Sequence, residues 1–193
     1  MLKNLREYIK AVILEEKSQV HKKLRIFDFD DTLVKTKSMV TVTSASGETC
    51  KLTPGEYAIY DQKSGDHFDY EDFNKLIDPK AIKWTVKILQ NIVSAGSEVI
   101  ILTARGSQDP VKQFLEDVGL PPIDVIALAD ADPQKKADFI SARISKDDLT
   151  WVEFFDDSPK NIEAVNKLKV KHPGVVIKAR LIVHRNEDLS MLS

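Results

Sequence analysis

The sequence predicts an α/β protein with a mostly parallel sheet covered by helices on both faces, and one small insert. Three observations indicate this fold. A short apolar segment, 24–30, ends in carboxylates; residues 34–78 are polar and irregular; and from residue 79 onward strand-like and helix-like segments alternate strictly. A length of 193 residues suits one compact domain with an insert.

Residues 2–18 are predicted to form an amphipathic helix, because apolar side chains recur there at helical spacing among charged ones. The apolar stripe comprises Leu2, Leu5, Ile9, Val12 and Ile13. We assign residues 1–23 to this segment. The pattern favours a helix that packs against the domain over one that mediates oligomerisation, and the sequence leaves the oligomeric state open.

The segment 24–30 has the pattern of a buried strand whose carboxyl end meets solvent. After it, Val40–Thr43 and Glu48–Thr53 are predicted to pair as a β-hairpin across the turn Ser44–Gly47. Pro54 and Gly55 give a further turn signal. Residues 34–78 are therefore predicted to be a small flap that contains a hairpin, not a large helical lid.

The remaining chain is predicted to alternate between helices and strands, with Gly or Pro at several boundaries. The expected helices span 79–95, 110–118, 133–144 and 159–168, and the expected strands span 98–103, 123–128, 151–156 and 174–184. With residues 24–33, the segment 79–193 is predicted to form the core domain.

Composition excludes several classes of protein. The net charge of −2 gives no global basic field for nucleic acid, although a local basic patch stays open. A single cysteine, Cys50, excludes an intramolecular disulfide and a zinc–thiolate cluster. Apolar runs such as Val99–Leu102 are far shorter than the ~20 residues of a membrane helix. The charged start, Met1–Lys10, is unlike a signal peptide, so we expect a cytoplasmic protein with no membrane partner.

Chemistry-bearing side chains gather at the predicted strand ends. One strand ends at Asp28–Thr32, a later one at Thr103–Gly106 and another at Asp156–Ser158, while the helix near residue 133 adds Lys135 and Lys136. Ligands of open parallel sheets bind at the carboxyl ends of strands. These side chains are therefore expected to meet, with the first strand central and the other two on either side of it.

Together these residue types suit phosphoryl transfer, although each alone is more often a turn or a helix cap. Clustered carboxylates require a cation or a proton, and oxygen ligands without His or Cys favour Mg²⁺. One carboxylate can attack phosphorus, and a second can serve as acid and base. A lysine and a threonine can then hold the phosphoryl oxygens.

The same residues resemble the motifs of the haloacid dehalogenase (HAD) superfamily. Phe27–Leu33 resembles its first motif, Leu102 and Thr103 the second, a lysine at 135 or 136 the third, and Asp156 with Asp157 the fourth. Asp31 stands where many members carry Gly and others an acidic residue. The resemblance implies a Rossmann-like three-layer α/β/α HAD fold with a small cap at 34–78, and a Mg²⁺-dependent phosphatase that hydrolyses phosphate monoesters.

The resemblance also implies roles for individual residues. Asp28 would be the nucleophile that forms an aspartyl-phosphate, and Asp30 the general acid/base that also gives its backbone carbonyl to Mg²⁺. Thr103 would bind the transferring phosphoryl group, and Lys136 is the first choice for the third motif, with Lys135 as the alternative. The implied metal set is Asp28, Asp30, Asp156 and Asp157, and which of the last two binds directly stays open.

The substrate is less well indicated. Members with a small cap resemble enzymes that act on large substrates, and short strings here resemble phosphatase domains of nucleic-acid end repair. We therefore expect a phosphorylated substrate such as a nucleotide or a nucleic-acid end, with Lys35, Lys37 and Arg105 near its further phosphates. The insert's aromatic residues, Tyr57 among them, could stack a base, although a small core of their own is favoured.

The alternatives are a phosphotransferase, a phosphatase of small molecules or phosphoproteins, and a non-catalytic binding module that keeps the fold. A non-catalytic module would be expected to lack one of the motif carboxylates, and none is missing.

Overall fold

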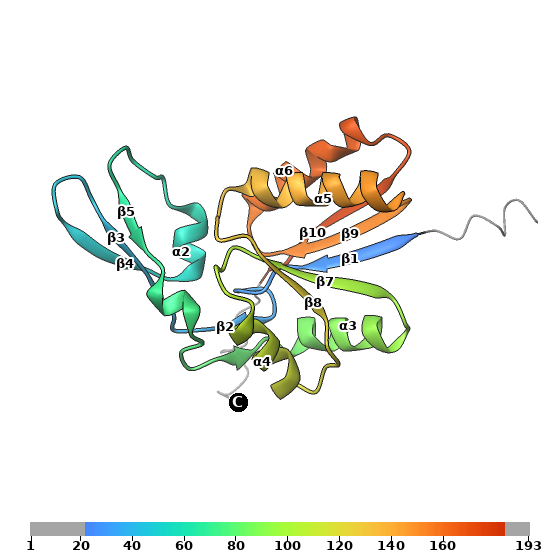
Figure 1. Cartoon of the computed structure of the whole chain (residues 1–193), viewed down its shortest axis with the longest axis horizontal. Coiled ribbons are helices and arrows are strands. Elements are labelled where there is room, and N and C mark those ends of the chain that lie inside the picture. Colours follow the sequence, from blue (N-terminus) through green and yellow to red (C-terminus); the bar gives the residue numbers. More distant parts are fainter. Residues whose placement is uncertain (1–21, 184–193) are drawn as a thin grey trace, which may run out of the picture.

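The structure is a computed structural model that describes residues 22–183, so the predicted helix at 2–18 lies outside the described residues. Its centre is a five-stranded parallel sheet of order β10-β9-β1-β7-β8 (Figure 1). The strands are β1 (Lys23–Phe27), β7 (Glu98–Thr103), β8 (Asp124–Ala127), β9 (Trp151–Asp156) and β10 (Val176–Leu181). The predicted central position of the first strand, between those ending at Thr103 and Asp156, is confirmed.

Helices cover both faces of this sheet, as predicted (Figure 1). One face carries α5 (Pro133–Asp147) and α6 (Pro159–Lys171), and the other carries α3 (Lys83–Ser94) and α4 (Asp109–Asp117). Strand β1 is buried on both sides: Leu24 and Ile26 belong to one apolar core, and Phe27 to the other, where it stacks on Phe155. Burial on both faces explains why this strand is mostly apolar, and its one internal charge, Arg25, pairs with Glu153 of the neighbouring strand β9.

The insert folds as a small unit of its own beside the carboxyl ends of the main strands (Figure 1). The predicted hairpin is confirmed as the antiparallel pair β3 (Val40–Thr43) and β4 (Thr49–Leu52). A third strand, β5 (His67–Asp69), pairs with the other edge of β3 and was not predicted. A short 3₁₀ helix, η1 (Glu71–Asn74), follows it.

The expectation of a turn at Pro54 and Gly55 is wrong, because these residues begin helix α2 (Pro54–Ile59). Thr53 caps the helix by accepting from the Glu56 N–H at 3.2 Å, and the Glu56 carboxylate accepts from the Thr53 N–H at 2.8 Å. This reciprocal capping box fixes the start of a helix of only six residues.

The two ends of the insert are tied together where it leaves the core. Strand β2 (Val34–Lys35) pairs antiparallel with β6 (Lys80–Ala81), so the predicted helix 79–95 begins only at Lys83. The last strand is also shorter than the predicted 174–184. Among the described residues, every helix is too short or too polar to serve as a membrane span.

Candidate active site

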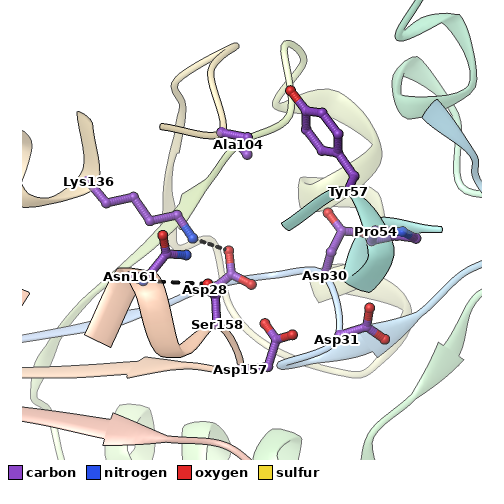
Figure 2. Close-up of a pocket in the computed structure, with 11 residues that line it drawn as sticks. Asp28, Asp30, Asp31, Pro54, Tyr57, Ala104, Lys136, Asp157, Ser158 and Asn161 are labelled. Atoms are coloured by element: carbon purple, nitrogen blue, oxygen red, sulfur yellow. Dashed lines mark hydrogen bonds and ion pairs between the residues drawn. The ribbon is translucent and has the colours of Figure 1, made fainter. Parts of the chain in front are cut away.

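The carboxyl ends of the central strands meet at one pocket of about 520 Å³, a volume that includes its open mouth. Asp28 directly follows β1, and its N–H donates to the Phe155 carbonyl at 2.9 Å, so the sheet ladder fixes its backbone. Lys136 reaches the same point from the first turn of α5 (Figure 2). The insert closes the opposite side of the pocket with Pro54 and Tyr57 from α2.

Lys136 is the lysine of the site. Its Nζ donates to Asp28 Oδ1 at 2.6 Å and to Asp156 Oδ2 at 2.8 Å, and the side chain is buried. Burial would lower the pKa of Lys136, but the two carboxylates outweigh burial and raise that pKa, so the side chain stays an ammonium ion. Lys135 is exposed on the same helix, so Lys136 is the one of the two lysines that lines the pocket.

Asp28 is the buried carboxylate at the centre of the pocket. Burial raises its pKa well above the usual range, Lys136 opposes the shift, and Asp156 and Asp157 add to it. Lys136 binds Oδ1, whereas no described residue donates a hydrogen bond to Oδ2. Asp28 therefore presents one oxygen to the pocket while its other oxygen is anchored.

Asp156 is fully buried and held by the start of α6. Its Oδ1 accepts from the Ser158 N–H at 2.8 Å, and the Asn161 amide lies 3.0 Å from both carboxylate oxygens. Asn161 was not identified in the sequence. Its position in the sequence could have indicated this role, because Asn161 comes three residues after Ser158, the N-cap of α6. A side chain at that position in the first turn of the helix can point back toward the end of the preceding strand.

Asp157 completes a group of three carboxylates that could hold a metal ion. One oxygen from each of Asp28, Asp156 and Asp157 lies within 4.8 Å of the others. Burial raises the pKa of Asp157 to about 7, with Asp156 and Asp31 contributing to the shift. Carboxylates crowded in this way fit a divalent cation that prefers oxygen ligands, as Mg²⁺ does. Asp30 was expected to bind the metal through its backbone carbonyl, and its side chain is not part of this group of carboxylates.

The Asp30 carboxylate is instead paired with Arg105. The guanidinium donates from Nε to Asp30 Oδ2 at 2.8 Å and from Nη2 to Oδ1 at 2.7 Å. Its Nη1 donates to the Lys75 carbonyl of the insert at 3.2 Å, and none of the Arg105 side chain is exposed. These three contacts direct donors of Arg105 at Asp30 and Lys75, and the expectation that Arg105 contacts further phosphates of a substrate stays a prediction.

The other expected substrate-binding residues also lie away from the pocket lining. The Thr103 hydroxyl is buried and accepts from the Arg105 N–H at 3.1 Å, so the neighbouring Ala104 lines the pocket instead. Lys35 lies in β2 and is exposed, and Lys37 pairs with Asp78 at 2.7 Å. The structure thus brings together the predicted carboxylates and Lys136, but not Lys35 or Lys37.

The chain matches no protein-family model and no curated protein. The arguments for its function therefore come from the site itself.

Magnesium is expected to raise the melting temperature, and to raise it more at about pH 8 than at about pH 6. The pKa of Asp157 rises from its ordinary 3.8 to about 7 on folding, so without a cation its contribution to stability is lost as pH rises through that range. A Mg²⁺ ion held by these carboxylates would require the deprotonated form of Asp157 and would offset this loss. At about 100 times Kd the shift should be roughly 5–10 °C at the higher pH. Thermal unfolding with and without MgCl₂ measures it, and an equal or larger shift at the lower pH would contradict the assignment.

Proposed function

We propose that the protein is a Mg²⁺-dependent phosphatase of the HAD type, which hydrolyses phosphate monoesters through an aspartyl-phosphate on Asp28. One observation carries the proposal: Asp28 is buried at the end of the central strand, with Lys136 on one oxygen and the other oxygen directed into the pocket. The order of the motif carboxylates along the chain, which resembles that superfamily, supports the same reaction.

In the first half of the reaction, Asp28 Oδ2 attacks the phosphorus of the bound ester. The new bond joins this oxygen to phosphorus, and the bond from phosphorus to the alcohol oxygen breaks with its electron pair. Lys136 keeps the carboxylate oriented through Oδ1, and its charge stabilises the negative charge on the phosphoryl oxygens. Asp30, which also lines the pocket, gives the departing alcohol oxygen a proton.

In the second half, water attacks the phosphorus of the aspartyl-phosphate. Asp30 takes the water's proton, the bond between phosphorus and Asp28 Oδ2 breaks, and inorganic phosphate leaves. Arg105 acts as a positioning residue, because its two hydrogen bonds hold the Asp30 carboxylate at the pocket edge.

The carboxylates of Asp28, Asp156 and Asp157 would hold the magnesium ion. When bound, Mg²⁺ neutralises negative charge on the phosphoryl oxygens and lets an anionic nucleophile approach them. Asn161 and the Ser158 N–H keep Asp156 in place for this role.

Phosphate release from a panel of monoesters tests the proposal. Hydrolysis is expected with MgCl₂, is expected to stop when the protein is treated with EDTA, and should return when Mg²⁺ is added back. Absence of hydrolysis of every ester in the presence of Mg²⁺, or full activity in EDTA, would contradict it.

A further inference from the structure

We infer that the site takes a phosphate monoester whose alcohol is uncharged and carries a flat ring, and that it disfavours substrates with a second phosphate. This inference rests on the proposed function and names the class of its substrate. Two features of the pocket carry it: the charge of its lining and the ring of Tyr57 at its mouth.

The lining is strongly acidic outside the phosphoryl position. Four carboxylates line the pocket, from Asp28, Asp30, Asp31 and Asp157, whereas Lys136 is the only cation among the described residues that line it. Lys136 is buried and bound to Asp28 and Asp156. The reacting phosphoryl group would occupy the positive charge that Lys136 and a bound divalent cation supply. A second phosphate would therefore face carboxylates.

The cations expected to bind a polyanion do not face this space. Arg105 directs its donors to Asp30 and Lys75, and Lys37 is paired with Asp78. Lys35 does not line the pocket. A nucleic-acid end carries phosphates beyond the reacting one, and its binding relies on such cations. The described surface of the pocket therefore favours a small monoester over a polymer end.

Tyr57 supplies a ring where the alcohol of the ester would leave. Figure 2 places it on the insert side of the pocket, across from Lys136 and beyond Asp30. Its hydroxyl lies 2.6 Å from the Tyr70 hydroxyl, and its ring packs at 5.6 Å from the centroid of Phe68. Because Tyr70 engages the hydroxyl, Tyr57 offers the pocket the ring rather than a polar group. A ring fixed in this way can stack on a flat group of the substrate.

Helix α2, which carries Tyr57, lies close to Asp31 of the pocket lining. A Cβ atom at Gly55 would lie 3.3 Å from Asp31 Oδ2, so this glycine allows the insert to approach the carboxylate closely. Asp31 itself has φ of 53°, a left-handed conformation that Asp and Asn tolerate better than most residues. An Asp31→Asn variant should therefore remove the charge and keep the backbone.

Three substrates with one common reacting ester test the inference. They are a nucleoside 5′-monophosphate, ribose 5-phosphate, which lacks the base, and the nucleoside 3′,5′-bisphosphate, which adds a charge. We expect kcat/KM for the monophosphate to exceed that for each of the other two by about 10-fold or more. Tyr57→Ala should reduce the preference for the base about 10-fold, and Asp31→Asn should reduce the discrimination against the bisphosphate.

Two variants serve as controls. Tyr57→Phe keeps the ring and should keep the preference for the base. Tyr60→Ala removes a ring of the same aromatic cluster that does not line the pocket, and should also leave the preference unchanged. If the protein hydrolyses all three substrates equally, or prefers the bisphosphate, the inference is wrong and the proposed function stands. If it hydrolyses no phosphate ester, both are overturned.

Discussion

Replacing Asp28 with Asn is expected to lower kcat for every phosphate ester at least about 1,000-fold, because a neutral amide cannot attack phosphorus. The substitution keeps the shape of the side chain, and Lys136 keeps its contact with Asp156. The fold should therefore survive, and thermal unfolding of the variant checks that it does. Steady-state phosphate release measures the loss.

The matched control is Asp132→Asn. Asp132 is an exposed carboxylate beside the pocket that caps α5 by accepting from the Gln134 N–H at 2.9 Å. Because Asn caps helices as well as Asp does, this variant should keep both fold and activity. If Asp28→Asn hydrolyses phosphate esters at the rate of the control variant, Asp28 is not the nucleophile.

Replacing Lys136 with Met is expected to lower the free energy of unfolding by about 3–5 kcal/mol at neutral pH without divalent cations. Met has similar length, but it leaves the buried carboxylates of Asp28 and Asp156 without the ammonium ion that lies 2.6 and 2.8 Å from them. Activity should be lost as well. Chemical denaturation in EDTA measures the change in stability.

Lys135→Met is the control for this variant, since it makes the same substitution one residue earlier on the exposed face of α5. Its free energy of unfolding should stay within about 0.5 kcal/mol of the original. Mg²⁺ should restore part of the stability lost in Lys136→Met, because the cation neutralises the same carboxylates. Equal stability of the two variants would show that Lys136 does not balance a buried charge.

The core of the fold could be predicted because its elements are long and their patterns are regular. The parallel strands are mostly apolar, since both faces of the sheet are covered, and each later strand is followed or preceded by a clear helix. The convergence of Asp28, Thr103 and Asp156 then fixed the expected order of three strands. Lys136 could be preferred because it starts a helical pattern in which Phe139, Ile140 and Arg143 lie on nearby faces.

The insert was less predictable because its elements are too short to show a period. Strand β5 has three residues and helix α2 has six, so neither fills a window in which alternation or helical spacing can be counted. The capping box of Thr53 and Glu56 was the available signal for α2, since Thr followed three residues later by Glu marks a helix start. Because α2 was not predicted, the position of Tyr57 beside the pocket could not be predicted from the sequence either.

The role of Arg105 could not be predicted because it depends on a neighbour that is distant in sequence. Strands β1 and β7 pair with Phe27 opposite Ile101, which brings the segments after both strands side by side. Arg105 therefore meets Asp30, 75 residues away in the chain. A guanidinium beside a carboxylate forms two hydrogen bonds to it, and this pairing allows the arginine side chain to be buried. The position of Arg105 in the sequence does not reveal which carboxylate is its partner.

The measurement that tests the central claim most directly is the location of the phosphoryl group during turnover. The protein is mixed with substrate and Mg²⁺, quenched in acid within one turnover, digested and analysed by mass spectrometry. The account predicts an acid-stable phosphoryl group on the peptide that contains Asp28, absent from the Asp28→Asn variant. Complete turnover with no phosphoryl group on Asp28 at any time, or a phosphoryl group on another residue, would contradict it.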